Sequence, residues 1–432
     1  MADPADIAHL LRRTEFVARP ARLGELTPLT IADAVENILD ITANASPAPP
    51  PELLVDDPNH RYDQLVAAYH WWIDAMVARP RAIQEKMTLF WHGHFTTGIS
   101  DGVGRVDLML RQNQLYRSAG MGNLLPLTQS MAVDPAMLYY LSGANNTKGA
   151  PNENFARELM ELFTLGVGNY AEDDVAASAR AWTGHNAVDG TYVFVPTRHD
   201  TANKTFFGTT KNWDGPDIIN EILRDNAGKR QVAARYIARK LWEFFAYVGP
   251  EPALLEDLQN TFLVNNLEIT PLLRYMFNRT EFYSPTAKQG LIRTPADWSV
   301  ALSFYSGKTA KDLSLVSRGE SMGQQLFDPP NVAGWKANGY WLTTSTLSAR
   351  AILARDLAAK LRLNGGFDNL AAMTVTDAVT YVANYFGLTD LSASTWAGLV
   401  NGYQAERNIA KNTAAATNLL IMVMLAPEMH CA

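Results

Sequence analysis

The sequence predicts a mainly α-helical fold, with a large multi-helix body and one small β-hairpin near residues 191–208. Apolar residues recur at spacings of three and four along most of the chain, as in amphipathic helices. Alternation of β-branched or aromatic residues with polar ones, which is typical of strands, is confined to one region. At 432 residues and 47% hydrophobic content, the chain can bury a large core without disulfides. We therefore expect residues 1–432 to form a single large helical domain.

The expected helices follow one another along the chain. The first begins after Thr30, whose side chain can cap a helix N-terminus. The others repeat the pattern of apolar residues on one helix face. In chain order, the expected helices cover residues 31–41, 62–78, 81–91, 106–116, 135–143, 151–166, 229–248, 269–278, 347–363 and 414–425.

Three segments interrupt the helical pattern. Residues 46–59 are rich in proline and predict an exposed loop. The insertion at residues 190–210 reads "GTYVFVPTRHDTANKTFFGTT" and predicts a hairpin, with His199 and Asp200 near its tip. Residues 327–342 contain Pro, Asn and Gly together with tryptophans, and predict an aromatic loop.

The composition excludes several classes of protein. The chain carries 37 basic and 44 acidic residues, whereas nucleic-acid binding normally requires a basic face. Cys431 is the single cysteine, so no intrachain disulfide can form. No apolar run approaches about 18 residues, so we expect no membrane span. The first residues lack the basic and then apolar pattern of a signal peptide, so the chain as written predicts no export signal.

Residues 90–95 read "FWHGHF" and place two histidines on either side of Gly93. Because glycine disfavours helix, we expect His92 and His94 to leave the preceding helix in an extended segment, where their side chains share a face. There they could bind one metal ion or bracket a substrate. The alternative is structural, with each histidine hydrogen-bonded to backbone carbonyls at a helix end.

The segment "PNENFARELMELFTLG", residues 151–166, predicts a central helix. Asn152 can cap it and Gly166 can end it. Its apolar face, which we expect to be buried, consists of Phe155, Leu159, Leu162 and Phe163.

The polar residues of this helix allow two interpretations. Glu153, Arg157 and Glu161 are four residues apart, as in a surface ladder of ion pairs. Asn154 and Glu158 lie beside the apolar face, where partial burial would suit a ligand or a base. In this second interpretation Glu158, Glu153 and Arg157 are catalytic, while Asn152 and Asn154 bind substrate.

Other candidate residues lie in the predicted loops. His199 and Asp200 form a second polar pair, although aspartate is also a common turn former. Trp335 and Trp341 could form a stacking platform for sugar rings, or a lid that packs on the core. Lys204 could bind an anion, as could Arg239, and both could equally be surface charges.

Several of these segments, taken together, resemble one bacterial family. "HLLRRTEF", "KMTLFWHGHF", "NENFARELMELFTLGVGNYAEDDVAASARAWTG", "HDTANKTFFG", "RKLWEFFA" and "LFDPPNVAGW" follow in the order of that family's signatures. The chain is thus similar, over nearly its whole length, to the family catalogued as domain of unknown function 1800. It departs from the family pattern at Glu15 and Val17, which replace glycines, at Ala171, where threonine is common, and at His185, where tryptophan is usual.

The resemblance implies a mostly helical protein of a family that is frequently exported, often encoded beside a sulfatase-like partner. It implies no established reaction. The positions that match its signatures are mainly polar and are His92, His94, Asn152, Glu153, Asn154, Arg157, Glu158, His199, Asp200, Lys204 and Trp335.

Three hypotheses follow. The first is a metal-dependent hydrolase of an extracellular polymer or ester, with zinc or another first-row cation held by His92, His94, His199 and Asp200. In it, these residues and Glu158 would share one polar pocket. The second is a non-catalytic helical partner of the sulfatase-like protein. The third is a carbohydrate-binding protein that uses Trp335 and Trp341. The residues expected to bind substrate are Asn152, Asn154, Lys204, Trp335 and Trp341.

Overall fold

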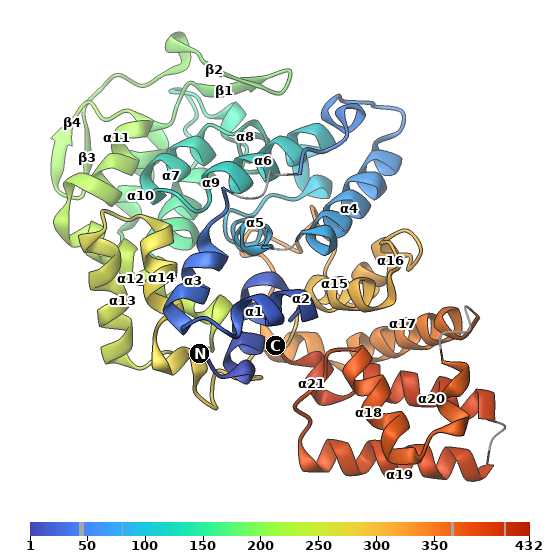
Figure 1. Ribbon diagram of the computed structural model, residues 1–432. Coiled ribbons are helices and arrows are strands. Elements are labelled where there is room, and N and C mark those ends of the chain that lie inside the picture. Colours follow the sequence, from blue (N-terminus) through green and yellow to red (C-terminus); the bar gives the residue numbers. More distant parts are fainter. Residues whose placement is uncertain (43–46, 80, 364–366, 410–411) are drawn as a thin grey trace.

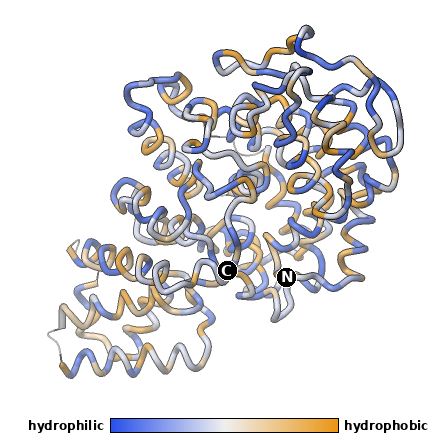
Figure 2. Tube along the Cα trace, turned by 180° about the vertical axis from the view of Figure 1, so that it is seen from behind, coloured by the Kyte–Doolittle hydropathy of each residue, from blue (hydrophilic) through white to orange (hydrophobic). Residues whose placement is uncertain are grey.

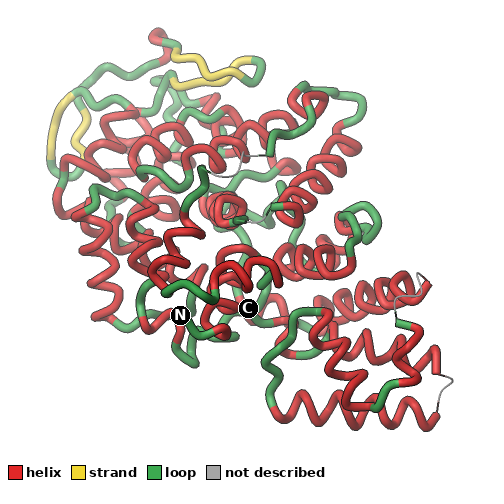
Figure 3. The backbone as a smooth tube through the Cα atoms, in the orientation of Figure 1, coloured by secondary structure: helices red, strands yellow, loops and turns green. Residues whose placement is uncertain are grey.

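The computed structural model describes residues 1–42, 47–79, 81–363, 367–409 and 412–432. Helices make up most of the described chain, and the strands form two small two-stranded sheets (Figures 1 and 3). The prediction of a mainly α-helical fold is confirmed. Short 3-10 or π-helical segments are labelled η below.

The N-terminal third contains eight α-helices in the described residues. The cap predicted at Thr30 is present, since its side chain accepts a hydrogen bond from the amide of Asp33. The elements are α1 (Pro4–Glu15), α2 (Pro20–Leu26), α3 (Ile31–Leu39), η1 (Pro51–Leu54), α4 (Arg61–Ala78), α5 (Ile83–His94), η2 (Ile99–Val103), α6 (Val106–Ala119), α7 (Leu124–Ala132), α8 (Pro135–Tyr140) and η3 (Gly143–Asn145).

The middle of the chain carries all the named strands. Its elements are α9 (Asn154–Glu158), η4 (Leu159–Thr164), α10 (Glu172–Ala181), β1 (His185–Val188), β2 (Thr191–Phe194), η5 (Pro196–Arg198), β3 (Lys204–Phe206), β4 (Thr209–Lys211), α11 (Gly215–Asn220), η6 (Glu221–Asp225), α12 (Ala227–Phe245), α13 (Pro252–Val264), α14 (Ile269–Phe277) and η7 (Thr280–Tyr283).

Helices make up most of the described C-terminal third, and most of them lie together at one end of the molecule (Figure 1). Its elements are α15 (Pro295–Ser306), α16 (Leu315–Ser321), η8 (Asn338–Leu342), α17 (Thr344–Leu363), η9 (Asp368–Ala372), α18 (Val375–Tyr385), α19 (Ala393–Ile409), α20 (Asn412–Met424) and α21 (Pro427–His430).

The buried apolar residues form two large clusters, and α5 contributes to both. Ile83, Met87 and Trp91 belong to the cluster built around α1–α3 and α9–α14. Leu89 belongs to the cluster built around α4, α6 and α15–α20. Because both sides of α5 are covered, every residue of this helix except Gly93 is buried.

The predicted central helix is present with shifted ends. Its α-helical part begins at Asn154, with Glu153 at the N-cap, and its last turn is the π-helical η4. Asn152 precedes the cap, and its side chain accepts a hydrogen bond from the amide of Asn154. The expected apolar face is confirmed, with Phe155, Leu159 and Phe163 buried and Leu162 packed against the same cluster.

The prediction that residues 190–210 form a single hairpin is wrong. β1 pairs with β2, in a register that places His185 opposite Phe194, and β3 pairs separately with β4. His199 and Asp200 lie in the connection between the two hairpins. The two alternating segments that were predicted to pair with each other are therefore β2, in the first hairpin, and β3, in the second.

The predicted loops are found with small modifications. In the 46–59 segment residue 46 lies outside the described residues, and the rest is non-helical except for the 3-10 turn η1. Residues 327–342 form a loop that ends in the 3-10 turn η8.

Hydrophilic and hydrophobic residues alternate along the helices (Figure 2), and no described helix is long and apolar enough to cross a membrane.

Candidate functional site

His92 and His94 remain in α5, so the expectation that they leave the helix in an extended segment is wrong. In a helix, residues two apart point about 200° away from each other. His92 consequently contacts Trp72 and Phe327, whereas the His94 ring contacts the side chain of Phe163. The two imidazoles belong to different environments.

His92 holds the beginning of the aromatic loop. Its Nε2 accepts a hydrogen bond from the amide of Phe327, at 3.0 Å. Burial lowers the pKa of His92 to about 3, so the ring is neutral near pH 7 and keeps the lone pair that this bond requires. Its ring also lies 5.4 Å from the ring of Trp335.

The aromatic loop closely approaches α5 at Gly93. Gly334 has a φ of 76°, and a Cβ added there would lie 2.5 Å from the carbonyl oxygen of Gly93. Glycine is the residue that tolerates both this backbone conformation and this distance. The contact places the side chain of Trp335 beside the end of α5.

His94 is oriented toward α12. Its Nε2 lies 3.0 Å from the carbonyl oxygen of Phe163, which can only accept, so Nε2 carries the proton. Nδ1 therefore has the free lone pair, and the Nζ of Lys240 lies 3.5 Å from it. Burial, reinforced by the charge of Lys240, lowers the pKa of His94 well below its ordinary value. His94 is thus neutral and presents a hydrogen-bond acceptor to the amino group of Lys240.

Lys240 is an amine in a largely apolar environment. Burial and the neighbouring charge of Arg239 lower its pKa to about 8, against the opposing charge of Glu243. Its Nζ lies 5.1 Å from the centre of the Tyr236 ring. Within the described residues, no carboxylate lies within ion-pair distance of Lys240. Its charge is therefore available to a ligand.

Lys240 and His94 lie in a cleft of about 560 Å³ between α5, α12 and the aromatic loop. We refer to it as the aromatic cleft, because four of its lining residues are Phe90, Phe244, Trp335 and Trp341. The indole Nε1 of Trp341 is buried and has no hydrogen-bond partner in the described structure. Aromatic walls with a few polar groups are typical of sites for small organic ligands.

A smaller cavity of about 70 Å³ adjoins the aromatic cleft and shares several of its lining residues, among them Ala337, Asn338 and Trp341. We refer to it as the basic recess, because Arg13, Lys86 and Arg293 line it.

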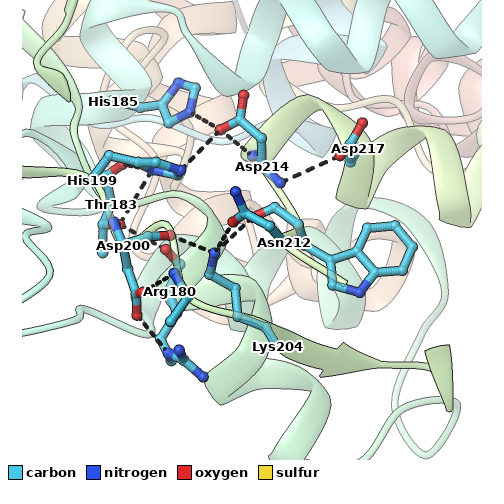
Figure 4. Close-up of polar contacts among 12 residues, drawn as sticks. Arg180, Thr183, His185, His199, Asp200, Lys204, Asn212, Asp214 and Asp217 are labelled. Atoms are coloured by element: carbon cyan, nitrogen blue, oxygen red, sulfur yellow. Dashed lines mark hydrogen bonds and ion pairs between the residues drawn. The ribbon is translucent and has the colours of Figure 1, made fainter. Parts of the chain in front are cut away.

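A separate group of polar residues joins the hairpins to α11 (Figure 4). The Nε2 of His185 donates to Asp214 Oδ1 at 3.0 Å, and its Nδ1 accepts from the hydroxyl of Tyr192 at 2.9 Å. The Nδ1 of His199 donates to the Thr183 carbonyl at 2.8 Å, and its Nε2 lies 3.9 Å from Asp214 Oδ1. Burial opposes ionisation of Asp214, but the hydrogen bonds from His185 and from the amide of Gly215, together with the interactions with the two histidines, outweigh it and lower the pKa of the carboxyl.

The neighbouring charges in Figure 4 also bind protein groups. Asp200 accepts from Arg180 Nε at 2.7 Å, and this bond lowers the pKa of the carboxyl. Lys204 donates to Asn212 Oδ1 at 3.1 Å and to the carbonyl of Trp213 at 2.9 Å. Asp214 also caps α11 by accepting from the amide of Gly215. These contacts fasten the hairpins to the helical body.

The predicted catalytic residues on α9 lie apart from the aromatic cleft. Arg157 pairs with Glu153 at 3.1 Å and with Glu172 at 2.8 Å on the surface. Asn154 is exposed, while Asn152 is partly buried, and its amide donates to the side chain of Asn146. Glu158 is half-buried, and burial together with the charge of Glu161 raises its pKa.

The structure does not assemble the predicted metal donors. His92, His94 and His199 each use a ring nitrogen for a backbone hydrogen bond, and Asp200 pairs with Arg180. Throughout the described ranges, no three His, Cys, Asp or Glu side chains are grouped so that they could hold a metal ion. The predicted donors are therefore not grouped around a site for one metal ion in the described structure.

The comparison with protein families gives one match. The model of the family described as "protein of unknown function (DUF1800)" matches residues 9–431. The chain belongs to this family. No curated protein and no solved structure matches the sequence significantly. The DUF1800 region includes the aromatic cleft, the basic recess residues from Arg13 to Arg293 and the group around Asp214.

Sequence reasoning found part of this arrangement. His94, Trp335 and Trp341, predicted separately, line one cleft. Lys240 and Glu243 were missed, although the family segment "RKLWEFFA" contains both. Arg239, the neighbouring cation that the sequence singled out, is exposed.

Proposed function

We propose that this protein binds a ring-shaped organic ligand, of which a sugar is the best match, in the aromatic cleft. The observation that carries the proposal is that Trp335 and Trp341 line the same cleft, and that the Trp341 N–H is buried without a partner. Aromatic faces provide apolar contact, and an N–H beside them can bind a hydroxyl or another acceptor.

The polar groups of the cleft suit the same ligand. Lys240, Gln324 and Asn338 provide donors, and Glu243 provides an acceptor, around the aromatic walls. A few fixed polar groups orient a ligand whose main contact is apolar. They would bind the hydroxyl groups at the edge of a sugar ring.

Binding is favoured over hydrolysis. Most glycoside hydrolases use two carboxyl groups on opposite sides of the scissile bond. Among the described residues, Glu243 is the one carboxylate that lines the aromatic cleft. The metal-dependent hydrolase is not proposed, because its predicted donors are not grouped. Association with a sulfatase-like protein stays a prediction.

The test uses the variant Trp335→Ala and a panel of soluble neutral and acidic oligosaccharides, examined by glycan array and then by isothermal titration calorimetry. Loss of one stacking wall should weaken binding of the best ligand at least about tenfold, which corresponds to about 1.4 kcal/mol. Tyr62→Ala removes an exposed aromatic residue on α4 and is the control. A panel without any ligand for the parent protein, or equal affinity in Trp335→Ala, would refute the proposal.

A further inference from the structure

The basic recess brings together three cations from distant parts of the chain. Arg13 is on α1, Lys86 is on α5, and Arg293 precedes α15. All three residues are buried, with exposed fractions of 3%, 5% and 4%. Burying a charge is costly unless an opposite charge or several hydrogen bonds compensate for it.

The acidic residues of the recess do not compensate for all three cations. Asp297 forms an ion pair with Lys86. Glu243 stands where the recess meets the aromatic cleft, and its charge acts on Lys240. In the described part of the chain, neither arginine forms an ion pair with a carboxylate, so positive charge is in excess.

The two arginines keep donors free. Arg13 donates from Nη2 to the carbonyl of Ala287 at 2.6 Å, and its Nε has no partner in the described structure. Arg293 donates from Nε to the carbonyl of Cys431 at 3.1 Å, and its Nη1 is buried without a partner in the same sense. Buried guanidinium donors are normally hydrogen-bonded, so their free positions indicate a missing acceptor.

The size of the recess defines that acceptor. A cavity needs about 10–15 Å³, measured in the same way, to hold one water molecule. The volume of about 70 Å³ is large enough for a carboxylate, sulfate or phosphate group. Since Ala337 and Trp341 line both cavities, a group in the recess can belong to a ring in the aromatic cleft.

We propose that the basic recess is the anion subsite of the aromatic cleft, and that the ligand is an acidic ring compound, such as a sugar bearing a carboxylate, sulfate or phosphate group. The choice of an acidic ligand rests on the proposed function. The binding of an anion by the recess does not, because Arg13, Lys86 and Arg293 would recognise the inorganic ion as well.

The first experiment titrates sulfate and inorganic phosphate into the full chain by calorimetry, at constant ionic strength. The matched variants are Ala337→Glu and Ala337→Gln. Ala337 is exposed at the shared mouth, so both variants should fold, and they differ in one negative charge. We expect Ala337→Glu to bind sulfate at least about tenfold more weakly than Ala337→Gln, and Lys86→Gln to lose binding.

The second experiment compares an oligogalacturonate with its neutral methyl ester. We expect the acidic form to bind at least about tenfold more tightly, and Trp335→Ala to weaken both forms. If no sugar binds the parent protein while sulfate still binds Trp335→Ala, the sugar ligand is refuted and the anion subsite is retained. Absence of sulfate and phosphate binding, or equal binding by the two Ala337 variants, would overturn the subsite.

Discussion

Two adjacent residues of α5, Glu85 and Lys86, each belong to a separate group of buried charged side chains. Glu85 accepts from Arg117 at 2.8 Å through each carboxylate oxygen, from Arg79 at 3.1 Å and from the indole of Trp72 at 3.0 Å. Burial alone would raise the pKa of Glu85, but the hydrogen bonds and charge of Arg117, together with the charge of Arg79 and the bond from Trp72, outweigh it and lower the pKa.

The group around Lys86 has the opposite balance. Lys86 pairs with Asp297, while Arg13 and Arg293 bring further positive charge without a carboxylate partner among the described residues. Burial, reinforced by the charges of Arg12 and Arg293 and opposed by that of Asp297, lowers the pKa of Arg13 to about 9. In the Glu85 group each arginine forms an ion pair with the carboxylate, and in this sense the group is complete and stabilises the fold. The Lys86 group is incomplete, which is the property expected of a binding site rather than of a structural network.

The largest expected effect is on the complete group. Glu85→Gln removes the negative charge and leaves Arg117 and Arg79 buried without it. Breaking a buried pair from one side typically costs about 3–5 kcal/mol. The free energy of unfolding, measured by urea denaturation, should fall by this amount. A loss below about 1 kcal/mol would show that the two groups are alike.

The incomplete group should respond differently. Arg13→Met removes a buried charge that other cations repel, and the Ala287 carbonyl keeps its bond from the amide of Gly290. Without added anion, the free energy of unfolding should be the same as that of the parent or higher by up to about 1 kcal/mol. The reason is that an apolar residue of similar size replaces an uncompensated ion. A decrease of about 3 kcal/mol would mean that Arg13 is part of a structural network.

The smallest expected effect is at the surface. Arg157→Ala removes the ion pairs with Glu153 and Glu172, which are solvated and worth at most about 1 kcal/mol. The same denaturation experiment should give a change of about 0.5 kcal/mol or less, and ligand affinity should not change. A large loss of ligand binding with intact stability would restore the catalytic role that the sequence suggested for Arg157.

The sequence predicted the parts of the fold that depend on local pattern. The apolar face of residues 155–163 is the clearest example, because its spacing alone defines the buried side. The prediction that the helix ends before Gly93 is wrong, because α5 continues to His94. Packing on both sides of α5 outweighs the weak helix preference of a single glycine, which is about 1 kcal/mol.

The binding site was less predictable, because its members are distant in sequence. Trp335 and Trp341 are close together and were recognised as a possible platform. Nothing in the order of residues indicates that Arg13 meets Arg293, or that Lys240 meets His94. Such contacts depend on how the helices pack and not on any local motif.

The cleft and its recess draw on residues from α1 to the last residues of the chain. Contacts between such distant segments carry the highest cost of loop closure, so they form late when a protein folds. During synthesis, Lys86 and Arg13 would emerge long before Arg293 and Trp341. The pocket can therefore be completed only once the segment from Arg293 to Trp341 is present, so that retention on an immobilised acidic sugar would separate chains containing this segment from shorter ones.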